Sequence, residues 1–230
     1  NSLILKMIPH KYFISACINF KLSVPKINNL KKEKKTNITI LNAINNLLNE
    51  DFKIIDFDIN KIDNKFVLES KKLLPNNNYV GFSITQGNIY RKKEWSLDNI
   101  VKISFFLKEK GKIPVFFIDK KKEELKNKIE NLIPFALFPE HKTNLSSPAL
   151  VTCLAQRLNF AITIDNGIMH MLGLSKVPMI SLFGPTDSEK FAPSYINSLV
   201  LDSKKLYNSE NVNSITVEDV LQVAKHHLNF

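Results

Sequence analysis

The stretch Ile162-Thr163-Ile164-Asp165-Asn166-Gly167-Ile168-Met169-His170 decides the fold of this chain. A β-branched run ends at Asp-Asn-Gly, and a helical pattern begins immediately, as it does after a strand of a parallel sheet. Open α/β sheets bind ligands at such turns. Gly167 permits close approach to the backbone, and the N–H groups of the next helix form an anion site. The alternative is that Asp165 and Asn166 only cap the helix and that His170 is a core histidine.

Two further turns of the same kind lie elsewhere in the chain. Met179–Phe183 is β-rich and ends at Gly-Pro-Thr-Asp, and a strand that begins at Tyr79 ends at Thr85–Gly87. We expect the three turns to line one crevice, because the carboxyl ends of parallel strands share one edge of a sheet. Lys93 follows the third turn and could supply a point charge for a diphosphate. The alternative interpretation of Lys93 is a solvated surface charge. Trp95 is expected to be buried in the core and to anchor the next helix.

From residue 79 onward, short β-rich runs alternate with helical stretches, which predicts an α/β fold with a doubly wound parallel sheet. The expected strands are Tyr79–Ile84, Ile113–Ile118, Phe135–Phe138, Phe160–Ile164 and Met179–Phe183. Ser96, Ser147 before Pro148, and Thr216 are expected to cap helices that begin directly after them. Gly111 is expected to lie just beyond the end of the first of these helices.

Residues 1–75 follow a different pattern. They hold an apolar piece around Ile14–Phe20, a helical stretch at Ile38–Leu48 and a polar connector over residues 50–78. We interpret residues 1–75 as the remnant of an N-terminal α/β domain with its connector, and residues 76–230 as the C-terminal domain. The expected hinge is Asn76–Asn78.

Composition limits the class of protein. The 230 residues are 44% hydrophobic and carry a net charge of +10. No apolar run reaches the roughly 20 residues of a membrane-spanning helix, so the location is expected to be cytoplasmic. The charge comes mainly from Lys, and the run at 120–122 is expected on a solvated helix start, so we predict no nucleic-acid partner. Cys17 and Cys153 lack metal-ligand spacing, and we predict no metal site.

The order of these motifs carries a family resemblance. Lys-x-Trp at 93–95, Asp-x-Gly-x-x-His at 165–170 and Phe-Gly-Pro-Thr at 183–186 follow one another. Together they resemble the C-terminal domain of glycosyltransferase family 9, the ADP-heptose:lipopolysaccharide heptosyltransferases. The resemblance covers roughly residues 76–230. It implies two facing Rossmann-like domains (the GT-B arrangement), no metal or cofactor, and inverting transfer of a sugar from a nucleotide-sugar donor to the lipopolysaccharide core.

The resemblance also implies a set of donor-binding residues, which are Thr85, Gln86, Gly87, Lys93, Glu123, Glu124, Asp165, Asn166, Gly167 and His170. The turn at 85–87 matches the segment that contacts the donor phosphates. Lys93 matches the lysine that stabilises the departing diphosphate. The segment from Asp165 matches the one near the diphosphate and sugar. Glu123 or Glu124 stands where the family often has an acid near the ribose or base.

Three departures from the family pattern matter. The segment Asp119-Lys120-Lys121-Lys122 replaces the Gly-rich residues of the family, so the donor nucleotide or the position of this loop can differ from those of the family. Asn166 replaces the more usual Ser or Thr. The family's general base, an aspartate near the start of the N-terminal domain, has no counterpart in this chain. The resemblance therefore implies that this chain alone binds donor but transfers sugar poorly or not at all.

Two other functions stay open at this stage. One is a nucleotide-sugar epimerase of similar architecture, against which the Lys-x-Trp turn argues. The other is a non-enzymatic nucleotide- or carbohydrate-binding module. The expected partners are an ADP-heptose-like donor and a glycolipid acceptor, and a basic surface favours peripheral contact with an anionic inner-membrane face. The sequence leaves the sugar, the nucleotide, the acceptor and the oligomeric state open.

Overall fold

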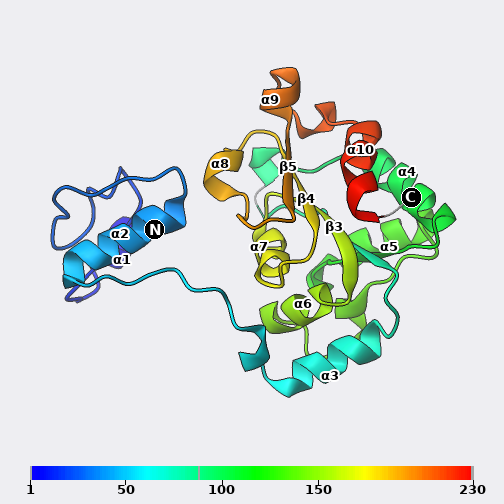
Figure 1. The fold of residues 1–230 in the computed structure, drawn as a ribbon, viewed down its shortest axis with the longest axis horizontal. Coiled ribbons are helices and arrows are strands. Elements are labelled where there is room, and N and C mark those ends of the chain that lie inside the picture. Colours follow the sequence, from blue (N-terminus) through cyan, green and yellow to red (C-terminus); the bar gives the residue numbers. More distant parts are fainter. Residues whose placement is uncertain (1, 88, 229–230) are drawn as a thin grey trace. The chain divides into compact units, whose positions relative to one another are not determined.

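The computed structural model describes residues 2–87 and 89–228, and its ribbon is drawn in Figure 1. Its contacts divide the chain into two compact units. The first holds residues 1–57 with 189–191, and the second holds residues 58–188 with 192–230. The division falls between Phe57 and Asp58. None of the described helices combines the length and the apolar character that crossing a lipid bilayer would require.

The first unit contains little regular structure. Helices α1 (Ser2–Lys6) and α2 (Thr36–Leu48) are joined by a loop in which Phe13 and Val24 form an isolated antiparallel bridge. The helix expected at Ile38–Leu48 is therefore present and begins two residues earlier. The expected α/β remnant has no strand among its described residues.

The polar connector contains a helix that the sequence pattern did not predict. Helix α3 (Asn64–Leu73) is capped by the Asp63 carboxylate, which accepts a hydrogen bond from the Lys65 N–H at 3.0 Å. At its end, the Arg157 guanidinium donates to the carbonyl oxygens of Leu74, Pro75 and Asn76 at 3.0–3.1 Å. The helix is marginal by its own composition, and its packing against α6 (Pro148–Ala155) stabilises it. The segment expected as a hinge is thus held by Arg157.

The second unit is built on five parallel strands in the order β2-β1-β3-β4-β5. The strands are β1 (Tyr79–Ser83), β2 (Ile113–Phe116), β3 (Leu158–Ile164), β4 (Met179–Phe183) and β5 (Ser198–Asp202). This confirms the predicted doubly wound parallel sheet. The chain winds from β1 to one side and then from β3 to the other, so the topological switch point lies between β1 and β3.

One strand prediction was wrong, and one strand was missed. Phe135–Phe138 forms only a single parallel bridge, between Leu137 and Val115. Pro134 and Pro139 flank this segment, and the chain turns into the 3₁₀ helix η4 (Pro139–Lys142), so the pairing cannot extend. Conversely, β5 was not predicted, although it pairs with β4 along its whole length.

Helices cover both faces of the sheet (Figure 1). On one face, α4 (Leu97–Glu109), α5 (Glu123–Leu132) and α10 (Val217–Leu228) pack on the strands and enclose the main core. On the other, α6 (Pro148–Ala155) contacts both α3 and α7 (Gly167–Leu174), and α7 contacts β3. The remaining short elements are η1 (Ile59–Lys61), η2 (Ile89–Arg91), η3 (Lys120–Lys122), α8 (Ser188–Phe191), α9 (Ser203–Tyr207) and η5 (Val212–Ser214).

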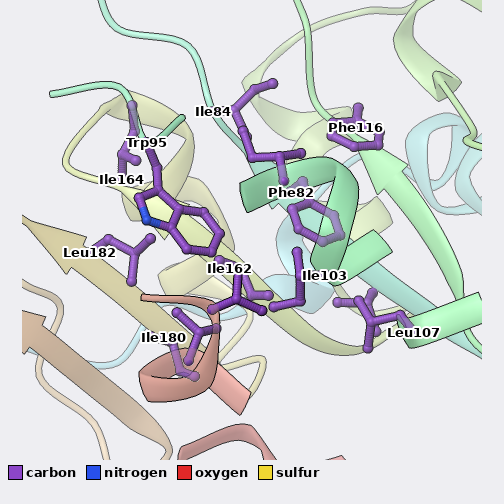
Figure 2. Close-up of a cluster of buried hydrophobic side chains, with 14 of the residues drawn as sticks. Phe82, Ile84, Trp95, Ile103, Leu107, Phe116, Ile162, Ile164, Ile180 and Leu182 are labelled. Atoms are coloured by element: carbon purple, nitrogen blue, oxygen red, sulfur yellow. The ribbon is translucent and has the colours of Figure 1, made fainter. Parts of the chain in front are cut away.

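The main core contains Trp95, as the sequence predicted. Figure 2 shows its indole ring within a cluster that includes Ile164 and Leu182. The ring is 3% exposed, and its Nε1 donates to the Ile215 carbonyl oxygen at 2.8 Å. Trp95 lies two residues after Lys93, so its burial fixes the chain that carries this lysine.

The three predicted caps are present. Ser96 Oγ accepts from the Asn99 N–H, Ser147 Oγ accepts from the Leu150 N–H, and Thr216 Oγ1 accepts from the Asp219 N–H. Gly111 follows α4 with a φ of +69°, a conformation that favours glycine. Local sequence therefore determines where these helices begin and end.

Candidate functional site

The candidate site is a pocket of about 460 Å³ at the carboxyl ends of the central strands. The turns after β1 and β3 meet there, at the switch point of the sheet, which is the usual ligand site of this architecture. Its lining residues are Thr85, Gln86, Gly87, Phe117, Asp119, Lys122, Glu140, Ser146, Ser147, Pro148, Val151, Asn166, Gly167, Ile168 and Met171.

Asn166 ties the two turns together. Its amide nitrogen donates to Ser83 Oγ at 2.7 Å and to the Thr85 carbonyl oxygen at 2.8 Å. Its amide oxygen accepts from the Met169 N–H at 3.0 Å and so caps α7. The side chain is both a cap and a link between β1 and β3, so helix capping and a role in the site do not exclude each other for Asn166. The link holds the turn at 85–87 against the start of α7.

Lys93 and Asp165 form an ion pair beside this link. Lys93 Nζ lies 2.5 Å from Asp165 Oδ2 and 3.1 Å from the Asp165 carbonyl oxygen. Their side chains are only 13% and 10% exposed. The Lys93 N–H also donates to Gln86 Oε1 at 2.9 Å. The pair joins residues that are 72 positions apart and supports the turns from beside the pocket lining.

Two glycines of the lining are not required by packing. A Cβ built on Gly87 or Gly167 would meet no neighbouring atom within 4 Å. Gly184 differs, because its Cβ would lie 2.7 Å from the Glu210 carbonyl oxygen. Glycine at 87 and 167 therefore leaves open space beside exposed backbone, and at Gly167, the first residue of α7, this is the arrangement that a phosphate group needs at a helix N-terminus.

The end of the pocket nearest β2 carries charged side chains. Asp119 follows β2 and caps η3, and Lys122 Nζ donates to the Gln86 carbonyl oxygen at 3.4 Å. Glu140 is 6% exposed, and its Oε1 accepts from Ser146 Oγ at 2.9 Å. Burial raises the pKa of the Glu140 carboxyl above its usual value. Nearby Asp119 raises this pKa further, and the Ser146 bond opposes the shift.

The predicted site residues divide into three groups. Thr85, Gln86, Gly87, Asn166 and Gly167 line the pocket. Lys93 and Asp165 lie beside it as an ion pair. The other three are exposed side chains outside the lining: Glu123 and Glu124 in the first turn of α5, and His170 on α7.

Sequence reasoning missed several lining residues. Lys122 is exposed, as expected for the run at 120–122, and it also lines the pocket. Asp119 could have been found, because it directly follows the β2 segment at the same edge as the other turns. Glu140 and Ser146 gave no such signal, because they lie in irregular chain between β2 and β3. No group of three or more possible metal-binding His, Cys, Asp or Glu side chains occurs in the described part of the chain.

The family model for glycosyltransferase family 9 (heptosyltransferase) matches residues 13–221 of this sequence. The chain belongs to glycosyltransferase family 9. Membership of this family does not favour the epimerase or the non-enzymatic module. A comparison with curated proteins gives no match.

Solved structures show the same fold as this family 9 chain. A family 9 glycosyltransferase from Veillonella parvula aligns with a TM-score of 0.69 at 18% identity, over 88% of this chain and 62% of that one. The E. coli heptosyltransferase WaaC with ADP-2-deoxy-2-fluoro heptose aligns with a TM-score of 0.62 at 15% identity, over 86% and 58%. E. coli ADP-heptose lps heptosyltransferase II aligns at 0.59 and 17%, over 74% and 53%. This chain thus spans 53–62% of the length of these three proteins.

Proposed function

We propose that residues 76–230 form a donor domain that binds a nucleotide sugar in the switch-point pocket. Residues 1–75 would then be the remnant of an acceptor domain and its connector. The sugar would pass to a lipopolysaccharide core acceptor with inversion and without a metal ion. The pocket carries the proposal, because it joins two backbone turns, open space beside two glycines and a lysine at the carboxyl edge of a parallel sheet.

The diphosphate is proposed to lie over the turn at 85–87 and the N-terminus of α7. The first N–H groups of a helix have no intrahelical partner and favour an anion. Lys122 contributes a charge from the pocket lining, and Lys93 contributes one from behind Asp165. Fixed donors and cations of this kind stabilise the charge that develops on a departing diphosphate.

The two ends of the donor are proposed to point in opposite directions from this turn. Gln86 also lines a second pocket of about 680 Å³, together with Tyr90, Arg91, Lys92, Glu94, Pro185, Glu210, Asn211 and Asn213. Acids and amides there could bond sugar hydroxyls. The nucleoside would then lie toward β2, among Phe117, Asp119 and Glu140. In this arrangement the sugar bond to be broken lies beside Lys93.

The family relatives support the donor class. The similar E. coli proteins are an ADP-heptose lps heptosyltransferase II and the heptosyltransferase WaaC with ADP-2-deoxy-2-fluoro heptose, which motivates an adenosine diphosphate sugar here. A glycolipid acceptor and the net charge of +10 motivate a cytoplasmic location with peripheral contact at the inner membrane. Three further residues remain proposed donor contacts, namely His170, Glu123 and Glu124. They lie outside the pocket lining, so a donor must extend beyond the pocket to contact them.

Titration calorimetry with the 230-residue chain tests the proposal. ADP should bind, and ADP-heptose should bind at the same site and compete with it. Since ordinary nucleotide affinity comes largely from the phosphates, adenosine should bind much more weakly than ADP. A chain that binds none of these compounds at millimolar concentration would contradict the proposed function.

A further inference from the structure

Glu140 is a buried acid whose bonds within the protein are incomplete. It lies in η4, it is 6% exposed, and it lines the switch-point pocket. Ser146 Oγ donates to Oε1 at 2.9 Å, but Oε2 is buried without a hydrogen-bond partner among the described residues. A buried carboxylate normally has its oxygens paired, because an unpaired one costs free energy.

The fold alone does not account for this acid. The described neighbours that shape its titration are Ser146, which donates one hydrogen bond, and Asp119, which carries the same charge sign. A glutamine would keep the bond to Ser146 without the like-charge contact. The carboxylate is therefore expected to gain its missing partner from a molecule in the pocket that carries a hydrogen-bond donor.

The sheet order shows which part of a donor would meet Glu140. The single bridge at Leu137 adds a sheet position beyond β2, so the carboxyl-end order is the Leu137 segment, β2, β1 and then β3. Glu140 follows the Leu137 segment, whereas the phosphate-binding turns follow β1 and β3. Glu140 thus lies at the far end of the pocket from α7, where the nucleoside would be placed by the proposed function.

We propose that Glu140 selects the nucleobase of the donor by accepting a hydrogen bond from an exocyclic amine. The inference rests on the proposed function, since it assumes that a nucleotide occupies the pocket. The terminal torsion of glutamate is broad and two-fold, so one oxygen can keep Ser146 while the other meets the base. A carboxylate only accepts hydrogen bonds, so an amine suits it and a carbonyl at the same ring position repels it.

Matched nucleotides test this contact. ADP and IDP differ at one edge of the same purine ring, where an amine beside an accepting ring nitrogen is replaced by a carbonyl beside a ring N–H, and CDP and UDP differ in the same way on a pyrimidine ring. In calorimetric titrations of the 230-residue chain, the amine member of the pair that the pocket accepts should bind about 10- to 100-fold tighter. Glu140→Gln should reduce this ratio to within about threefold, because an amide can donate as well as accept.

Glu130→Gln is the control, since Glu130 is an exposed glutamate on α5 that is paired with Lys126. It should preserve the wild-type ratio. The ratio is informative even when a variant loses affinity, because misfolding weakens both members of a pair equally. Titration of 2′-deoxy-ADP separates base from ribose recognition.

Two results would overturn base selection. The first is equal binding of ADP and IDP together with equal binding of CDP and UDP by the wild type, and the second is an unchanged ratio in Glu140→Gln, whether or not both members of the pair lose affinity equally. An equal loss that is absent for 2′-deoxy-ADP would place Glu140 on the ribose instead. These outcomes leave nucleotide binding intact and so differ from failure of the proposed function, in which no diphosphate binds and both proposals fall.

Discussion

Replacing Lys93 by alanine tests the proposed diphosphate site most directly. Lys93 Nζ donates to two oxygens of Asp165, at 2.5 and 3.1 Å, and both side chains are nearly buried. In the proposed complex this cation also balances the diphosphate. A hydrogen bond to a charged group contributes about 1.5–3 kcal/mol, so Lys93→Ala should weaken ADP binding roughly 10- to 150-fold.

The structure adds a second effect to this variant. Without Lys93, the Asp165 carboxylate loses its partner and directs a negative charge toward the diphosphate. Removing one member of a fully buried pair costs about 3–5 kcal/mol, which is an upper bound at this exposure. Lys93→Ala should therefore lower the melting temperature. The double variant Lys93→Ala/Asp165→Asn should recover part of the stability and part of the affinity, but not the wild-type affinity.

Calorimetry at low salt and thermal unfolding by circular dichroism would measure both effects. Lys128→Ala is the matched control, because it removes one charge from an exposed position on α5. If Lys93→Ala and Lys128→Ala bind ADP equally well while both stay folded, the diphosphate does not depend on Lys93. The lysine would then have only the structural role of joining the two turns.

Three further predictions concern the pocket. Gly167→Ala should fold with nearly unchanged stability but bind ADP at least about fivefold more weakly. Gly184→Ala should instead be destabilised by about 1–3 kcal/mol, because its Cβ meets a backbone carbonyl oxygen at 2.7 Å. Equal effects of the two substitutions in unfolding and binding assays would contradict this prediction. Glu140 has a raised pKa in the folded state, so its ionisation costs stability as pH rises above the ordinary value of 4.5. Glu140→Gln should thus stabilise the ligand-free chain in denaturant titrations at pH 7, with a gain that shrinks toward pH 4, and a pH-independent difference would refute the assignment. ADP affinity should be the same with EDTA as with Mg²⁺, and loss of binding in EDTA would point to a metal-bridged diphosphate.

Much of the second unit could be predicted from local sequence. The strands at 79, 113, 160 and 179 are continuous apolar runs, which is how strands buried on both faces of a parallel sheet appear. The caps at Ser96, Ser147 and Thr216 were found because a capping side chain bonds to backbone only two or three residues away. Three turns were predicted to line one crevice. The turns at 85–87 and 165–167 do so and are joined by Asn166, whereas the turn at 184–187 contributes no residue to the lining of this pocket.

The missed elements depend on contacts that are distant in sequence. Helix α3 is capped locally by Asp63, but its packing on α6 and the bonds from Arg157 hold its end. Strand β5 is short and partly exposed, and it is defined by pairing with β4. Such contacts override weak local preferences in either direction.

The sequence by itself determined the fold class, the family and the two turns of the site, because these follow from hydrophobic period, turn residues and motif order. Only the tertiary structure decided which charged side chains meet in and beside the pocket. Lys93 meets Asp165 across 72 positions, and the buried Glu140 comes beside Asp119 because the chain after α5 returns to the edge of β2. The interaction between two charged groups depends on the distance between them and on their burial. Both depend on the order of the strands in the sheet, and no spacing along the chain encodes that order directly.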